Sequence, residues 1–198
     1  MKKGLIGCAG AIVLVLLIGG FSLRSTYNEV VTLDQDVNAK WAQVQNVYQR
    51  RADLVPNLVE VVKGFAAQER AVLEEVTRAR ASVAGIQVTP EVLRDPEALR
   101  KFQEAQAQLG GALGRLLAVV ERYPDLKSNQ NFLALQSQLE GAENRIAVER
   151  RRYNEAVREY NTAVNRFPGS LVASLRGFSA RRYFEASPGA DAPPPIKF

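Results

Sequence analysis

The fold is decided by residues 132–167, which read FLALQSQLEGAENRIAVERRRYNEAVREYNTAVNRF. Apolar residues recur there at alternating intervals of three and four, the spacing that gives an α-helix one apolar face. A helix that starts at Ser128 or Asn129 and ends at Phe167-Pro168-Gly169 is roughly 58 Å long at about 1.5 Å per residue. A helix of this length needs long partners, so the sequence predicts an elongated antiparallel bundle.

Three further segments show the helical period, and none shows the alternation typical of a strand. We expect a first helix over 27–51, a second over 53–83 and a third over 95–123. The last two begin with an aspartate, a common helix cap, and Pro56 would lie in the first turn, where its missing N–H costs nothing. The segment 85–96 would be the loop between them. With the long helix, these segments make an all-α four-helix bundle.

A membrane anchor is expected at residues 4–23, an uncharged run that reads GLIGCAGAIVLVLLIGGFSL. At about 1.5 Å per residue it spans the roughly 30 Å hydrocarbon core, and Lys2 and Lys3 orient it by the positive-inside rule. A cleaved signal peptide is the alternative, because two lysines before an apolar run also open a secretory signal. No Pro or Gly follows Gly20 before the first helix, so anchor and helix can form one rod.

The predicted organisation is a single-pass protein of the inner (plasma) membrane. It has a cytoplasmic N-terminus at 1–3, a transmembrane anchor at 4–23, an extracytoplasmic bundle at 26–168, a basic and aromatic return segment at 169–186 and an irregular Pro-rich tail at 187–198.

Composition argues against catalysis. The 198 residues include no His, which removes Ser-His triads, His proton relays and His metal ligands. The one Cys, Cys8, lies in the apolar run, where a thiol is poorly placed to ionise. We therefore expect no enzyme, no cofactor and no metal, and favour a structural or interaction role.

Polar residues interrupt three of the predicted apolar stripes, namely Glu69, Gln106 and Glu149. Counted from the predicted far end of the bundle, all three fall at a similar depth. We predict that they form one polar core layer that sets the register of the helices, as a buried Asn does in coiled coils. A carboxylate metal site is the weaker alternative, because di-iron bundles need Glu-x-x-His pairs.

The corner of the bundle far from the membrane is expected to be polar. It would contain Arg50, Arg51 and Asp53 from the first turn and Asp125 and Lys127 from the third. This corner is either a partner or anion site, because a helix begins there with free N–H groups, or a set of caps and ion pairs.

Positive charge is concentrated at the C-terminal end. Residues 1–149 carry 17 basic and 17 acidic side chains, whereas 150–198 carry 9 and 4, so the net charge of +5 lies in the last quarter. Arginines alternate there with aromatic and aliphatic residues, which suits anionic lipid headgroups. Alternatively the leucines fold onto the bundle and the arginines are only solvated. The candidate lipid ligands are Arg158, Arg166, Arg176, Arg181 and Arg182.

Short motifs along nearly the whole chain carry a family resemblance. They are Tyr27-Asn28, Trp41 with Val44, QRRADLVPNLV at 49–59, YPDLK at 123–127, Asn131-Phe132, ENRIA at 143–147, Tyr153-Asn154 and the closing Ile196-Lys197-Phe198. By these motifs the chain resembles the LemA family of bacterial membrane-anchored proteins. The resemblance implies one N-terminal transmembrane helix and a helical bundle, in a family without an established biochemical activity. One departure is Gln68, where relatives often have His.

Together these features predict a scaffold or adaptor of the bacterial envelope, assembling with itself or with other envelope proteins. The alternative is a module that binds or shapes the membrane surface through its C-terminal Arg and aromatic residues. Membrane lipid is an expected partner in both, and nucleic acid is not.

Overall fold

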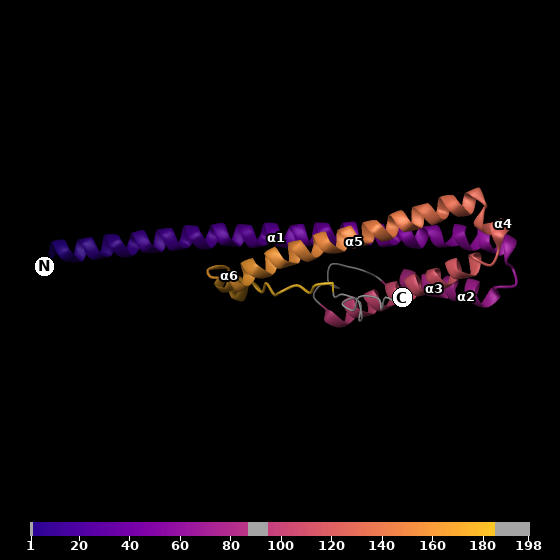
Figure 1. The fold of residues 1–198 in the computed structure, drawn as a ribbon. Coiled ribbons are helices and arrows are strands. Elements are labelled where there is room, and N and C mark those ends of the chain that lie inside the picture. The colour runs from indigo at the N-terminus through magenta and orange to yellow at the C-terminus, as the bar shows by residue number, and fades with distance from the viewer. Residues whose placement is uncertain (1, 87–94, 185–198) are drawn as a thin grey trace, which may run out of the picture.

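The computed structural model describes residues 2–86 and 95–184, without the side chains of residues 2–9, 11–13, 15 and 16. Within these ranges the chain is helical and has no strand, which confirms the all-α prediction. The described residues form six helices, which are drawn in Figure 1. They are α1 (Lys2–Phe65), α2 (Arg70–Ala84), α3 (Pro96–Val120), α4 (Pro124–Lys127), α5 (Gln130–Asn165) and α6 (Gly169–Arg176).

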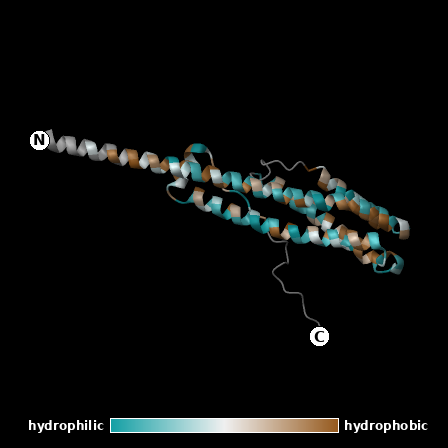
Figure 2. Cartoon of the chain, turned by 90° about the horizontal axis from the view of Figure 1, so that it is seen from above, coloured by the Kyte–Doolittle hydropathy of each residue, from teal (hydrophilic) through white to brown (hydrophobic). Residues whose placement is uncertain are grey.

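The most extended element is α1, whose 64 residues measure about 96 Å at 1.5 Å per residue. It joins the apolar run to the bundle without a break, as the rod prediction expected. Figure 2 shows α1 continuing alone beyond the bundle towards the N-terminus. Among the described residues, no helix combines the length and the apolar character that crossing a membrane requires.

The predicted boundary at 51–53 is wrong, because α1 continues through Pro56 to Phe65. A proline inside a helix leaves the carbonyl four residues earlier without its donor, here that of Ala52. Arg80 of α2 supplies the donor, since its Nε bonds the Ala52 carbonyl at 3.2 Å. Pro56 itself is exposed, so its ring disturbs no packing. The turn lies instead at 66–69, and α2 has 15 residues rather than about 31.

The helices run alternately away from and back towards the N-terminal end of the bundle (Figure 1). The turn at 66–69 and the connection through α4 lie together at the far end. Because α2 and α3 are shorter than α1 and α5, the bundle has four helices only in its far half. Nearer the apolar run, α1 and α5 are accompanied by α6 and the extended residues that follow it.

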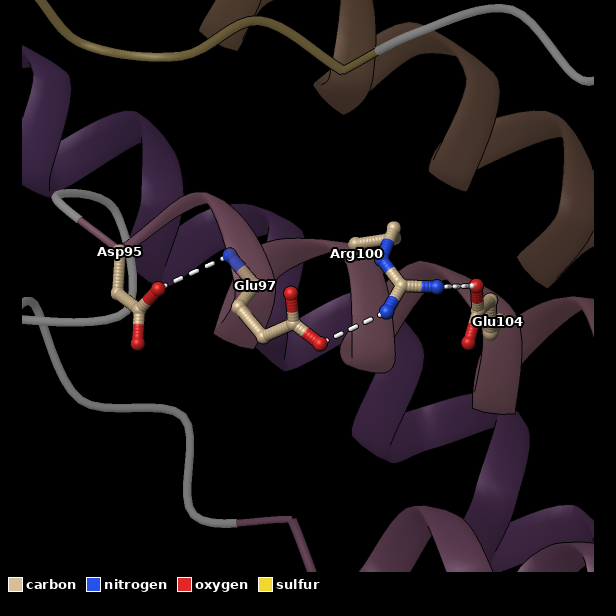
Figure 3. Close-up of polar contacts among 4 residues, drawn as sticks. All are labelled: Asp95, Glu97, Arg100 and Glu104. Atoms are coloured by element: carbon tan, nitrogen blue, oxygen red, sulfur yellow. Dashed lines mark hydrogen bonds and ion pairs between the residues drawn. The ribbon is translucent and has the colours of Figure 1, made fainter.

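Two helix starts follow the predicted caps. The Asp95 side chain accepts a hydrogen bond from Glu97 N at 2.9 Å, and Arg100 then bridges Glu97 and Glu104 (Figure 3). Asn129 caps α5 by accepting from two backbone N–H groups. The short helix α4 was not predicted. Most of the predicted loop at 85–96 and the tail at 187–198 lie outside the described residues.

The buried residues form two separate clusters along the bundle. The near core combines α1, α5, the start of α3 and two residues from the C-terminal side: Val30, Val37, Trp41, Val44, Tyr48, Leu99, Phe102, Ile146, Tyr153, Ala156, Val157, Tyr160, Val164, Ala173 and Phe184. The far core draws on five helices: Val55, Leu58, Val62, Ala66, Leu73, Val76, Leu109, Ala112, Leu113, Leu116, Val120, Leu126, Phe132 and Leu139, with Ala66 in the turn after α1.

Candidate functional site

The chain after α6 forms an extended segment that we call the strap, residues 177–184. It starts at Gly177, which has φ 73°, and it ends at Phe184, which is buried. The strap lies against α5 and α1, in the half of the bundle where α2 is absent. It thus takes the place of a missing helix.

Two Tyr-Asn pairs of α5, seven residues apart, hold the strap by its backbone. Asn161 accepts from Arg181 N at 2.8 Å and donates to Arg181 O at 2.9 Å. Asn154 makes the same pair of bonds to Phe184, at 2.8 and 3.0 Å. The neighbouring hydroxyls, of Tyr160 and Tyr153, donate to the carbonyls of Ser179 and Arg182 at 3.1 and 3.0 Å.

Arg181 anchors the strap by a buried charge. Its Nη2 bonds Asp34 Oδ1 of α1 at 2.6 Å, and the two residues are only 3% and 8% exposed. The guanidinium also lies 5.8 Å from the centre of the Tyr160 ring. Removing two charges from water is unfavourable unless they are paired, so this contact requires a positively charged side chain at this strap position.

Phe184 is the second anchor, and it enters an aromatic pocket. Its ring stacks on Trp41 at 5.7 Å and meets Tyr153 edge to face at 5.3 Å. The Arg150 guanidinium lies 4.9 Å above it. Burial raises the pKa of the Tyr153 hydroxyl well above its ordinary range, so Tyr153 keeps the proton that it donates to the strap.

A polar layer separates the near core from the far core. Arg51 of α1 is 4% exposed and donates to Glu143 Oε1 of α5 at 2.8 Å. It also donates to both the carbonyl and the side-chain oxygen of Gln106 on α3. The layer therefore ties three helices together at one level of the bundle.

The predicted membership of the polar layer is wrong except for Gln106. Glu69 lies in the turn after α1 because that helix is longer than expected, and it accepts from Tyr123 and Arg122, both at 2.9 Å. Glu149 pairs with Arg152 one turn along α5. The structure therefore does not bring Glu69, Gln106 and Glu149 together.

The predicted far corner is divided in the structure. Asp125 and Lys127 lie exposed on α4 at the far end. Arg51 is buried in the polar layer, and Asp53 accepts from Gln49 one turn earlier on α1. Since α1 continues for twelve residues beyond Asp53, about 18 Å, the basic corner with Arg50 does not form.

The predicted lipid ligands also divide. Arg181 is wrong as a headgroup ligand because it is buried against Asp34. Arg158, Arg166 and Arg182 are exposed, and Arg176 is exposed over the Tyr27 ring at 4.9 Å.

An exposed apolar patch accompanies the exposed arginines at the near end of the bundle. Phe167, just before α6, is 79% exposed, and Leu171 and Leu175 of α6 are 43% and 72% exposed, whereas Val172 and Ala173 of the same helix are buried. Phe178, which follows the helix, meets Tyr27 of α1 at 6.2 Å. The patch therefore lies beside α1 just after the apolar run.

A groove of about 800 Å³ opens between the end of α1 and α2. Val59 and Leu73 supply apolar surface, and Lys63, Arg70 and Glu74 supply charges. It differs from the strap site in that the described chain leaves it open to solvent.

The strap site was missed in the sequence, although one signal was present. Tyr153-Asn154 was noted as a single motif, but Tyr160-Asn161 repeats it one heptad later. The partnership of Asp34 with Arg181 joins residues 147 positions apart and has no local signal.

Comparison with known proteins agrees with the motifs. The family model described as the LemA family matches residues 40–198. Magnetosome protein MamQ of Magnetospirillum gryphiswaldense is 30% identical, over 87% of this chain and 69% of the relative. Magnetosome protein MamQ 2 of Paramagnetospirillum magneticum is 30% identical over the same shares. The resemblance predicted from the sequence is confirmed, and the chain belongs to the LemA family.

Proposed function

We propose that this protein is a membrane-anchored scaffold or adaptor of the bacterial envelope without catalytic activity. Residues 4–23 cross the inner (plasma) membrane once, residues 1–3 face the cytoplasm, and the bundle faces outward. The bundle assembles with itself or with other envelope proteins. The MamQ relatives are named as magnetosome proteins, and we take from that name only that chains of this family can belong to a defined bacterial structure.

The observation that carries this proposal is the continuity of α1. One helix, from Lys2 to Phe65, includes both the apolar run and the first helical segment of the bundle. A bundle attached in this way stands away from the anchor as a rigid unit, which is what a scaffold needs to present a surface at a fixed distance.

Two surfaces are available to partners at the far half. One is α4 with Asp125 and Lys127 exposed, and the other is the groove between α1 and α2. The groove combines apolar lining with charges of both signs at its rim, a composition that suits a polar-edged protein partner.

Photo-crosslinking in cells tests the scaffold role. A crosslinking amino acid replaces Asp125 on α4, Glu74 in the groove, or Gln108 on the exposed face of α3. Discrete adducts to another envelope protein, or a ladder of adducts between copies, are expected. Leu116 in the far core is the matched control and should give no intermolecular adduct. No adduct from any exposed position would contradict the proposal, as would turnover of a substrate that one substitution abolishes without unfolding.

A second candidate function, binding of the membrane surface, is favoured by the exposed patch on α6. With residues 4–23 in the bilayer, Phe167, Leu171 and Leu175 lie beside the point where α1 leaves it. Exposed Arg166 and Arg176 flank them, and this pairing of apolar and cationic side chains suits an anionic interface.

Hydrogen exchange of the full chain in nanodiscs tests this second function. Amides of 166–176 should be more protected in anionic than in zwitterionic nanodiscs, and added salt should reduce the difference. Replacing Leu171 and Leu175 by Ser should remove it. Equal protection in both lipids would rule this function out.

A further inference from the structure

The strap is bound as a peptide is bound by a receptor. Its carbonyl and N–H groups at Ser179, Arg181, Arg182 and Phe184 are paired with side chains of α5, and no strand or helix ladder includes it. If the strap left its binding surface on α1 and α5, these contacts would break without the unfolding of any helix.

The two Tyr-Asn pairs match the repeat of an extended chain. Seven residues of α5 advance about 10.5 Å, and three residues of an extended strap advance about 10 Å. Accordingly, Asn161 binds the backbone of Arg181, and Asn154, seven residues earlier on α5, binds the backbone of Phe184, three residues later in the strap. The hydroxyl contacts move from Ser179 to Arg182 in the same step. The spacing of the Tyr-Asn pairs on α5 therefore matches the spacing of the strap backbone, and the strap runs antiparallel to α5.

Two side chains add sequence selectivity to this backbone recognition. Arg181 reaches buried Asp34, and Phe184 fills the pocket made by Trp41 and Tyr153. The ligand that fits is an extended peptide with an arginine followed three residues later by an aromatic residue. The strap meets this requirement, and every copy of the chain carries it.

The joint between α6 and the strap allows redirection. Gly177 is exposed, its φ is 73°, and no atom lies within 4 Å of where a Cβ would be. Glycine adopts both signs of φ readily, so a change at Gly177 that opens the 3.0 Å hydrogen bond from Phe178 N to the Ala173 carbonyl redirects the strap while α6 stays packed through Val172 and Ala173.

We propose that straps exchange between copies, so that the strap of one molecule binds the strap-binding surface on α1 and α5 of a second. The hydrogen bonds and ring contacts that break within one molecule form again between the two, which leaves the cost of association as the main opposing term. A reciprocal exchange closes a two-fold dimer, and a one-way exchange continues into a chain. The inference rests on the proposed scaffold role and names its partner as a second copy.

Isotope-coded crosslinking of the full chain tests the exchange directly. A photo-crosslinking amino acid replaces Ser179, an exposed strap position, in unlabelled and heavy-isotope protein, and the two are mixed in detergent. Exchange predicts heavy-to-light adducts between the strap and α5 near Tyr160, in about half of all adducts at equal mixing if every strap is exchanged. Adducts confined to a single copy would overturn the proposal.

Complementation between two defective full-length variants gives an independent test. One variant lacks the two anchoring side chains of the strap, through Arg181→Gln with Phe184→Ser. The other lacks side-chain partners of the strap on the strap-binding surface, through Asp34→Asn with Asn154→Ala and Asn161→Ala. Each alone should lose wild-type association, and the mixture should form a one-to-one heterodimer that co-purifies through different tags. No heterodimer from helical, folded variants would overturn the exchange, as would undiminished self-association of either one.

The outcomes separate this inference from the scaffold proposal. If wild-type copies crosslink through α4 or the α1–α2 groove while strap adducts stay within one copy, the scaffold role holds and strap exchange is wrong. If no exposed position yields any intermolecular adduct, both are wrong.

Discussion

The near and far cores solve the same packing problem with different side chains. In the far core five helices contribute mostly Leu, Val and Ala. In the near core, to which α2 contributes no buried residue, Trp41, Tyr48, Phe102, Tyr153 and Phe184 pack ring against ring at 5.2–5.7 Å. Large rings and a strap therefore replace the volume of a helix, and the near core depends on a segment that the far core does without.

The largest expected effect is from Trp41→Ala, which removes the ring that Phe102, Tyr153 and Phe184 contact. We expect a loss of about 3–5 kcal/mol in the free energy of unfolding, measured by urea titration. Limited proteolysis should also become faster at Arg182 in the strap. Leu116→Ala in the far core is the control, with a loss of about 2–5 kcal/mol and no such local sensitivity. Equal cleavage of the strap in both variants would mean that the two cores are not independent.

Gly169→Ala should detach α6 from the near core. A Cβ there would lie 1.9 Å from the carbonyl oxygen of Ala163, a backbone atom that cannot turn aside. We expect a loss of about 3 kcal/mol, the upper end of the overpacking range, and faster hydrogen exchange in α6 and the strap. At Gly114 of α3 nothing lies within 4 Å, so Gly114→Ala should instead stabilise the chain by about 0.5–1 kcal/mol. If hydrogen exchange in α6 of Gly169→Ala stayed as slow as in the wild type, the predicted clash with Ala163 would be wrong.

Arg51→Met tests the polar border between the cores. It leaves the buried Gln106 side chain without the guanidinium, at a cost of about 1–2 kcal/mol. Adding Gln106→Leu should restore the stability to about that of the wild type or above, because apolar replacement of buried polar groups is often neutral or favourable. Calorimetry measures both variants. A double variant less stable than the single one would show that the layer stabilises the fold rather than only setting its register.

The smallest effect expected is from Tyr153→Phe, about 1 kcal/mol at neutral pH through the lost bond to the strap. Its pH dependence is more informative. Burial raises the pKa of Tyr153 above the ordinary 10.0, so its contribution is complete below pH 10 and decreases as pH rises further, where the unfolded chain ionises first. Stability measured across pH 9–11 should therefore fall less steeply in the variant. Burial also raises the pKa of Tyr48, which leaves part of the slope. An unchanged slope would contradict the assignment to Tyr153.

Local signals predicted local structure well. Asp95 and Asn129 cap the helices that the sequence assigned to them, and the heptad pattern of 132–167 became α5. Pro56 misled because the partner of the freed Ala52 carbonyl, Arg80, lies on another helix. That single error shortened the first helix and so moved Glu69 and Arg51 to the wrong levels.

The candidate site was less accessible to sequence reasoning. Gln106 was recognised as a polar core residue, but its partner Arg51 had been assigned to a surface corner. The strap depends on long-range pairs, above all Asp34 with Arg181, which no periodicity reports. Only the repeated Tyr-Asn pair can be recognised in the sequence, because a helix that binds an extended chain must present its binding residues at an interval that matches the chain.

The unbroken course of α1 has a mechanical consequence. From Leu23 to Phe65 the helix measures about 63 Å and continues through Pro56 without a break. If residues 4–23 are held in a bilayer as proposed, the helix would act as a lever whose short arm is the anchor, and a tilt of about 20°, ordinary for a spanning helix, would swing the far end sideways by roughly 20 Å. A change in bilayer thickness, which changes the tilt, would thereby change the lateral position of the far end of the bundle.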